Sequence, residues 1–154
     1  MNAKISPIRD CDCHNVTDCD GQSLGHYYPR EFADRVALRV NLKEAARLVA
    51  ATGNQKLRDE ILDAVEAEQD TAKHLIVRPA GSYVSVSVSN TRVDVRRATW
   101  QDLDGVFATP LEARAFALQS GAKEAWFDDS VPADFRRQII LGVVGFPLPA
   151  AVTA

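Results

Sequence analysis

Apolar residues recur at the helical spacing i, i+3, i+4, i+7 in neighbouring segments of the first half of the chain. The segments with this spacing are 30–40, 42–52 and 55–69. Asn41 is a good N-cap for the second of them, and Gly53 ends it just before Asn54 caps the third. The pattern therefore predicts an N-terminal helical pair or triplet, with a tight joint at residues 53–54.

The hydrophobic period changes from about 3.6 to 2 after residue 73. Segments 74–78, 83–89 and 93–96 alternate apolar and polar residues, as antiparallel strands with one buried face do. With a turn at Asn90-Thr91, Val86 would face Val95 and the valines would share one side of the sheet. We expect a three-stranded antiparallel meander over about 74–97.

Helix signals return in the last third of the chain. Thr109-Pro110-Leu111-Glu112 combines a cap, a proline at the first helical position and a capping-box glutamate. A short helix from Thr99 and a last helix from Ser130 to about Val144 give two to three C-terminal helices. The prediction is an α+β fold in one small domain, residues 29–146, preceded by a polar Cys- and Asp-rich arm, 1–28, and followed by a loose tail, 147–154.

Composition argues against some classes of protein, but it does not identify a function. A chain of 154 residues is one domain in size, and its net charge of −3 gives no overall field that attracts nucleic acid. The first residues, MNAKISPIRD, lack the apolar run of a secretory signal, and no apolar stretch approaches the ~20 residues of a membrane span. We expect a cytoplasmic protein without membrane association.

All three cysteines lie in one stretch, CDCHNVTDCDG, residues 11–21. Thiolates and imidazoles are the ligands of structural zinc sites. The predicted zinc ligands are Cys11, Cys13, Cys19 and His26, with His14 as the substitute for the fourth. The spacing differs from the usual pairs of C-x₂₋₄-C, so free thiols in a polar arm stay open as the alternative, and a disulfide would leave one cysteine unpaired. Beyond such a zinc ion, no cofactor is expected.

Two further motifs in this region match known sites only in part. Asp18-Cys19-Asp20-Gly21 resembles part of a calcium loop but lacks the closing glutamate. Gly21-Gln22-Ser23-Leu24-Gly25 has the letters of the G-x-S-x-G nucleophile elbow, but no apolar strand precedes it and no helix follows it. A Gly-rich loop is the interpretation that we prefer for residues 21–25.

Nucleic-acid binding is a second possibility in the middle of the chain. Helices followed by a hairpin over 30–97 have the order of a winged helix, but the recognition helix, 55–69, carries two basic and five acidic residues. The polar face of the predicted sheet gathers one aromatic and several basic candidates for binding: Tyr83, Arg92, Arg96 and Arg97.

The leading functional hypothesis is a non-catalytic cytoplasmic binding or regulatory protein that acts through protein–protein interaction. It rests on the lack of a P-loop, a dinucleotide fingerprint or an H-E-x-x-H motif in the sequence. The alternatives are a nucleic-acid-binding regulator and a small hydrolase with an unrecognised site. A pocket that joins His74 or His26 to a carboxylate would favour the hydrolase.

Overall fold

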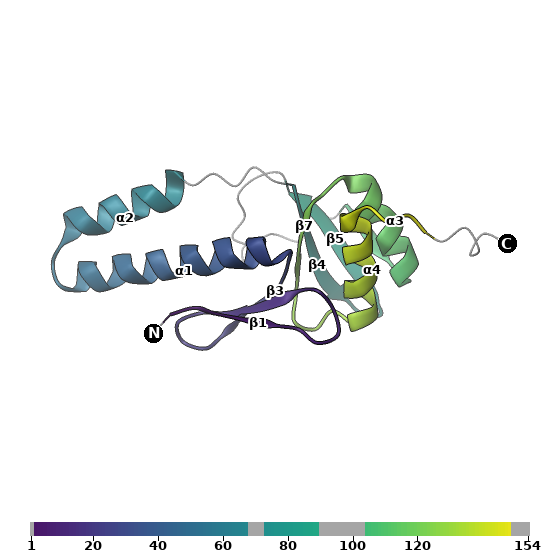
Figure 1. Ribbon diagram of the computed structural model, residues 1–154, viewed down its shortest axis with the longest axis horizontal. Helices are drawn as coiled ribbons and strands as arrows, with labels where there is room; N and C mark the ends of the chain where they lie inside the picture. Colours follow the sequence, from purple (N-terminus) through teal and green to yellow (C-terminus); the bar gives the residue numbers. More distant parts are fainter. Residues whose placement is uncertain (1, 68–72, 90–103, 149–154) are drawn as a thin grey trace.

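The computed structural model describes residues 2–67, 73–89 and 104–148. Within them, seven strands form one sheet in the order β1-β2-β3-β7-β4-β5-β6, and β4–β7 is its parallel pair (Figure 1). The strands are β1 (Lys4–Pro7), β2 (His14–Thr17), β3 (Ser23–Tyr28), β4 (His74–Ala80), β5 (Tyr83–Ser89), β6 (Gly105–Phe107) and β7 (Glu124–Phe127). The helices are α1 (Arg30–Ala51), α2 (Gln55–Ala67), α3 (Pro110–Ser120) and α4 (Ala133–Val144). The α+β class is confirmed.

Helices cover both faces of the sheet, and each face has its own apolar core. Alternation along the central strands separates the two: Leu75 and Phe127 pack with α3 and α4, whereas Ile76 and Trp126 pack with α1. The side chains of Trp126 and Phe127 are both buried.

The first helical segment is one continuous helix of 22 residues, so the predicted break at residue 41 is wrong. Asn41 does not cap a helix; its Oδ1 accepts a hydrogen bond from the backbone N–H of Ala3, 2.7 Å away, before β1. Good helix formers around Asn41 carry the helix through. The second joint is confirmed: Asn54 Oδ1 caps α2 by accepting from the N–H of Leu57, 3.1 Å away.

Residues 4–28, which show no strand period in the sequence, form β1, β2 and β3. These strands are four to six residues long and bury few side chains, chiefly Val16, Leu24 and Tyr27. A run this short cannot establish an alternation, so the sequence pattern missed it. The segment therefore belongs to the sheet.

The first two strands of the predicted meander are confirmed as an antiparallel pair, whereas the predicted turn at Asn90-Thr91 lies outside the described residues. β4 and β5 pair antiparallel with Val77 opposite Val86, and Val84 and Val86 are buried as expected. The other edge of β5 pairs with β6, where Val86 faces Gly105. Val86 therefore has a strand neighbour on each side, Val77 and Gly105, which leaves no place for the predicted pairing with Val95. Residues 90–103 themselves lie outside the described part.

The C-terminal helices follow their predicted signals. Thr109 caps α3 by accepting from the N–H of Glu112, and Gly121, with φ +71°, ends it in the left-handed conformation. α4 begins at Ala133, slightly later than predicted, and β7 was not predicted at all. Arg114 holds the start of the expected loose tail by donating to the carbonyls of Phe146 and Pro147. Residues 99–103 and 149–154 lie outside the described ranges.

Candidate functional site

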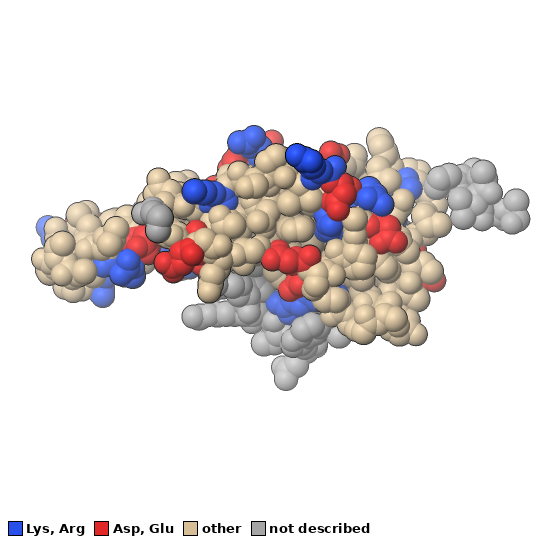
Figure 2. Space-filling model, turned by 90° about the horizontal axis from the view of Figure 1, so that it is seen from below, with Lys and Arg blue, Asp and Glu red and all other residues tan. Residues whose placement is uncertain are grey.

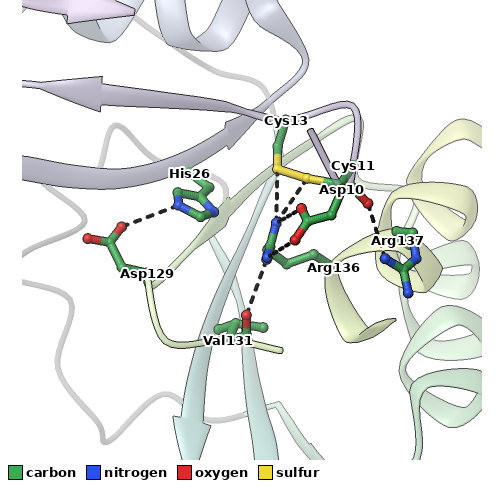
Figure 3. The surroundings of a disulfide bond; sticks show 8 residues. All are labelled: Asp10, Cys11, Cys13, His26, Asp129, Val131, Arg136 and Arg137. Atoms are coloured by element: carbon green, nitrogen blue, oxygen red, sulfur yellow. Dashed lines mark hydrogen bonds and ion pairs between the residues drawn. A yellow bond between two sulfur atoms is a disulfide. The ribbon is translucent and has the colours of Figure 1, made fainter. Parts of the chain in front are cut away.

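A disulfide joins Cys11 and Cys13 in the loop between β1 and β2 (Figure 3). The loop is closed by a hydrogen bond from the N–H of Ile8 to the carbonyl of Cys13, 3.1 Å. Cys13 is 1% exposed and belongs to the core beside α4, whereas Cys11 is half-buried. Only the Cys11 sulfur therefore lies on a residue that solvent reaches.

Arg136, in the first turn of α4, lies against both sulfurs. Its Nη1 is 3.1 Å from Cys11 Sγ and 3.7 Å from Cys13 Sγ, and the residue is 6% exposed. The guanidinium is fixed by Asp10, whose two oxygens lie 2.7 and 3.0 Å from Nη1 and Nη2, and by the carbonyl of Val131, 3.2 Å from Nε. These bonds hold a buried cation beside the disulfide.

Asp10 is the anionic partner of this arginine. The hydrogen bond from Arg136 holds the pKa of the Asp10 carboxyl below its usual value, and the charges of Arg136 and Arg137 add to the effect. Arg137 also donates to the Asp10 carbonyl, at 3.2 Å, from the outer side of α4. Asp10 and α4 are thereby tied together next to the disulfide.

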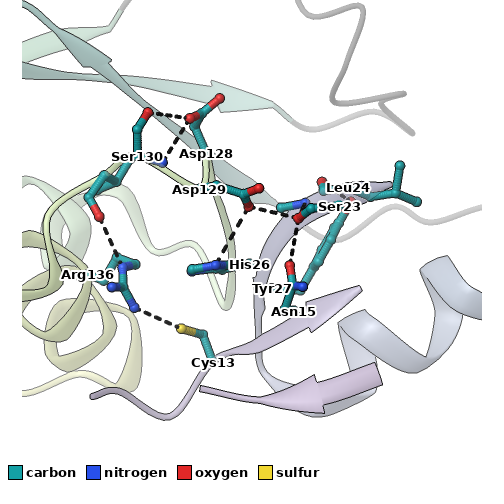
Figure 4. Close-up of polar contacts among 12 residues, drawn as sticks. Cys13, Asn15, Ser23, Leu24, His26, Tyr27, Asp128, Asp129, Ser130 and Arg136 are labelled. Carbon is teal, nitrogen blue, oxygen red and sulfur yellow. Dashed lines mark hydrogen bonds and ion pairs between the residues drawn. The ribbon is translucent and has the colours of Figure 1, made fainter. Parts of the chain in front are cut away.

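A second polar cluster lies beside the first, between β2, β3 and the turn after β7 (Figure 4). His26 Nε2 is 3.6 Å from Asp129 Oδ1, and the same carboxylate oxygen is 2.9 Å from Ser23 Oγ. Asn15 Oδ1 lies 2.8 Å from the Ser23 hydroxyl. Burial and then the positive charge of Arg136 lower the pKa of His26, against the carboxylates of its surroundings. Both effects favour the neutral imidazole over the charged one.

This cluster does not form a nucleophile with its base. In a serine hydrolase the imidazole contacts the serine hydroxyl, and the carboxylate lies behind the imidazole. Here Asp129 lies between Ser23 and His26, so the imidazole does not reach the hydroxyl in the required order. Ser23 also begins a strand rather than following one. The last glycine of the G-x-S-x-G stretch, Gly25, is instead a packing residue, because the Trp126 indole lies where a Cβ would be.

The predicted zinc ligands are distributed around β2 rather than gathered. Cys13 precedes this four-residue strand and Cys19 follows it, which separates them by roughly 13 Å of extended chain. His14 pairs with Tyr27, whereas His26 pairs with Asn15, so the two imidazoles lie on opposite faces. Among the described residues, no three His, Cys, Asp or Glu side chains gather as a metal site. Zinc uptake by the reduced chain stays a prediction.

A buried charged group lies on the opposite face of the sheet, under α1. His74 Nδ1 is 2.7 Å from Glu124 Oε2, and Arg35 of α1 pairs with Glu124 Oε1. Phe32 stacks on the His74 ring with the centroids 4.8 Å apart. His74 is 3% exposed, so this group joins α1 to the sheet and is closed to a substrate. The hydrolase hypothesis gains no support from either histidine–carboxylate pair.

The α1–α2 hairpin is the most prominent surface feature. It extends beyond the sheet, away from α3 and α4 (Figure 1). Large apolar side chains on it are exposed: Leu38 (49%), Leu48 (51%), Leu57 (39%) and Leu62 (36%). α1 carries five basic and three acidic side chains, and α2 carries two basic and four acidic. Charges of both signs are interspersed on the side of the molecule in Figure 2.

Of the residues predicted to bind a partner on the sheet, Tyr83 is exposed at the start of β5. Arg92, Arg96 and Arg97 lie outside the described ranges, so their position relative to Tyr83 stays a prediction. Within the described ranges, no helix has the length and apolar character to cross a membrane. No protein family, curated protein or solved structure matches this chain.

Sequence reasoning missed Arg136, Asp10 and Asp129. One signal was present: Arg136 stands three and four residues before Ile139 and Ile140, so it shares the buried face of its helix. A basic residue on an apolar face needs a buried partner. The identity of that partner could not be read, because Asp10 lies 126 residues away in the chain.

Proposed function

We propose that this protein is a non-catalytic binding protein that recognises another protein through the α1–α2 hairpin. The observation that carries the proposal is the extension of this hairpin beyond the sheet (Figure 1), together with exposed leucines on both helices. The exposed leucines are Leu38 and Leu48 on α1 and Leu57 and Leu62 on α2. A cytoplasmic location and a regulatory role belong to the same proposal.

The sparse packing within the hairpin supports the proposal that a partner binds there. Of the four fully buried residues of α1, three lie in its first eight residues, against the sheet, and only Ala46 lies in its outer half. In α2, Val65 is the fully buried residue among those described. A helix as short as α2 is marginal without tertiary packing, and the buried alanines of α1 supply little apolar area. A further helix against the leucines would add the missing contact.

The partner that fits is an amphipathic helix of another protein. Such a helix places leucine-sized side chains at i, i+3, i+4 and i+7, which match apolar positions on a helical pair. The interspersed charges of α1 and α2 would lie at the rim and select orientation more than affinity. The nucleic-acid alternative has less support, because α1 is continuous where a winged helix needs a turn, and α2 is acidic.

The test captures proteins from native cell extract on the immobilised full-length chain and then titrates the purified candidate partner. We expect Leu48→Glu and Leu57→Glu to weaken binding at least tenfold, because each places a charge in the apolar contact. Val106→Glu is the matched control: Val106 is 50% exposed, but it lies in β6. Circular dichroism checks that all three variants keep the fold.

Light scattering tests whether the partner helix belongs to a second copy of this chain. A dimer that Leu48→Glu dissociates and Val106→Glu preserves would support hairpin-mediated self-recognition. If the captured proteins and the oligomeric state are the same for the wild-type chain and all variants, the proposal is wrong.

A further inference from the structure

We propose that Cys11 and Cys13 are a redox-active pair that undergoes thiol–disulfide exchange with low-molecular-weight thiols and disulfides, and that Arg136 stabilises the reduced form. The inference is independent of the proposed hairpin function. It rests on a buried guanidinium that contacts both sulfurs (Figure 3).

The placement of Arg136 favours reduction chemically. A disulfide sulfur is a weak hydrogen-bond acceptor, so Nη1 has a poor partner at 3.1 Å while the disulfide is closed. Reduction puts a thiolate at the same position, and a guanidinium is one of the groups that stabilise a thiolate. Asp10 neutralises part of the Arg136 charge, but its side chain is 42% exposed while that of Arg136 is 7% exposed. Water therefore reaches the screening carboxylate more than it reaches the cation beside the sulfurs.

The exposure of the two cysteines sets the order of the steps. An incoming thiolate attacks Cys11 Sγ, because Cys13 is buried. The bond between the incoming sulfur and Cys11 forms, the bond between Cys11 and Cys13 breaks, and Cys13 leaves as a thiolate beside Arg136. A second thiolate then attacks the incoming sulfur, and Cys11 leaves. The electron balance is two thiols oxidised to one disulfide for each Cys11–Cys13 bond reduced.

In the opposite direction, the thiolate of Cys11 attacks a small disulfide and Cys13 resolves the mixed disulfide. Cys11 is the better nucleophile of the two, because it is more exposed and closer to Nη1. Cys19 takes no part, since it lies in the turn at the far end of β2. It is the free cysteine among the described residues and serves as an internal reference.

The experiment equilibrates the full-length protein in buffers with a range of reduced-to-oxidised glutathione ratios. Thiols are then alkylated, and mass spectrometry gives the oxidised fraction of Cys11–Cys13. We expect reversible oxidation and reduction with the fold retained. Arg136→Gln and Arg136→Lys should require at least threefold more reduced glutathione for half-reduction, since both lose the planar contact with two sulfurs.

Three variants separate this role from a general effect on the fold. Asp10→Asn removes the screening carboxylate and should shift the midpoint the other way, toward easier reduction. Arg47→Gln removes a cation of α1 that pairs with Glu44, and Cys19→Ser removes the third thiol; both should match the wild-type midpoint. If Arg136→Gln fails to fold, the midpoints of Arg136→Lys and Asp10→Asn test the proposal.

The proposal is overturned if the pair stays oxidised in the folded protein at every ratio. It is also overturned if Arg136→Lys and Asp10→Asn both keep the wild-type midpoint, or if Arg47→Gln shifts it as much as Arg136→Lys does. Opposite shifts for the Arg136 and Asp10 variants support it, because a mere loss of stability would move both in one direction.

Discussion

His74 and Glu124 are register partners in the parallel β4–β7 pair, and their side chains meet with Nδ1 2.7 Å from Oε2. Arg35 reaches the other carboxylate oxygen from α1, so one buried glutamate joins two strands and a helix. The three groups come from parts of the chain up to 89 residues apart. This is the point where the helical hairpin is fixed to the sheet.

Glu124→Gln should destabilise the protein by about 2 kcal/mol, because it removes the anion that pairs with Arg35 and His74 in a buried site. Urea unfolding followed by circular dichroism measures the difference. Glu60→Gln, on the exposed side of α2, is the control and should change stability by less than about 0.5 kcal/mol. Equal unfolding midpoints for the two variants would show that the buried pair does not hold the fold.

Val86→Asp should unfold the domain, whereas Ser87→Asp should leave it folded. Val86 is 1% exposed between β4 and β6, so an aspartate there is buried without a partner and costs several kcal/mol. Ser87 is half-buried on the other face of the strand, where water reaches a carboxylate. Thermal denaturation of both variants is the measurement, and similar midpoints would contradict the observed register.

Acidification below about pH 6.5 should destabilise the protein through His26. Burial and Arg136 lower the pKa of His26 in the folded state, so between the folded and unfolded pKa the unfolded chain binds more protons. Stability must then rise with pH in that window and fall as the pH drops through it. Asp10, whose folded pKa is also lowered, should add a further loss in more acidic solution.

Urea midpoints measured between pH 7.5 and 5 check this expectation. His26→Gln should flatten the dependence near pH 6, because glutamine does not titrate. A wild-type profile that is flat over this range, or a His26→Gln profile as steep as the wild type, would assign the effect to another group.

Features of the fold that depend on one short segment could be predicted from the sequence. The cap and proline before α3, the joint at Asn54 and the alternation around Val86 all gave the correct local structure. They depend on neighbouring residues and on burial of one face. Asn41 shows where local signals fail to predict the structure. Its side-chain oxygen does accept a backbone hydrogen bond, but the donor is the N–H of Ala3 and not an N–H of its own helix.

The candidate redox site could be anticipated only in its cysteines. The sequence marks Cys11 and Cys13 by their spacing, but it does not say whether they bind a metal or each other. Their surroundings include Arg136, which α4 brings to them from 123 and 125 residues away. Long-range pairing of single polar side chains leaves no period in the sequence, so no pattern could have identified it.

Gly25→Ala should cost more stability than Gly53→Ala, although both glycines have positive φ values of +107° and +88°. The strain of an L-residue in this region, about 1–2 kcal/mol, applies to both. A Cβ at position 53 meets nothing within 4 Å, whereas at position 25 it would lie 2.7 Å from Trp126 Cε2 and 2.8 Å from the carbonyl oxygen of Phe127. The Trp126 indole cannot yield easily, because its Nε1 donates to the carbonyl of Leu24, 2.7 Å away.

The added overpacking is about 1–3 kcal/mol, so we expect Gly25→Ala to lower the free energy of unfolding by roughly 2–5 kcal/mol in total. Guanidinium unfolding followed by tryptophan fluorescence measures both variants. Gly53→Ala supplies the strain alone, and the difference between the two isolates the contact with Trp126. If the two glycines tolerate alanine equally, the close contact with Trp126 does not limit the side chain at position 25.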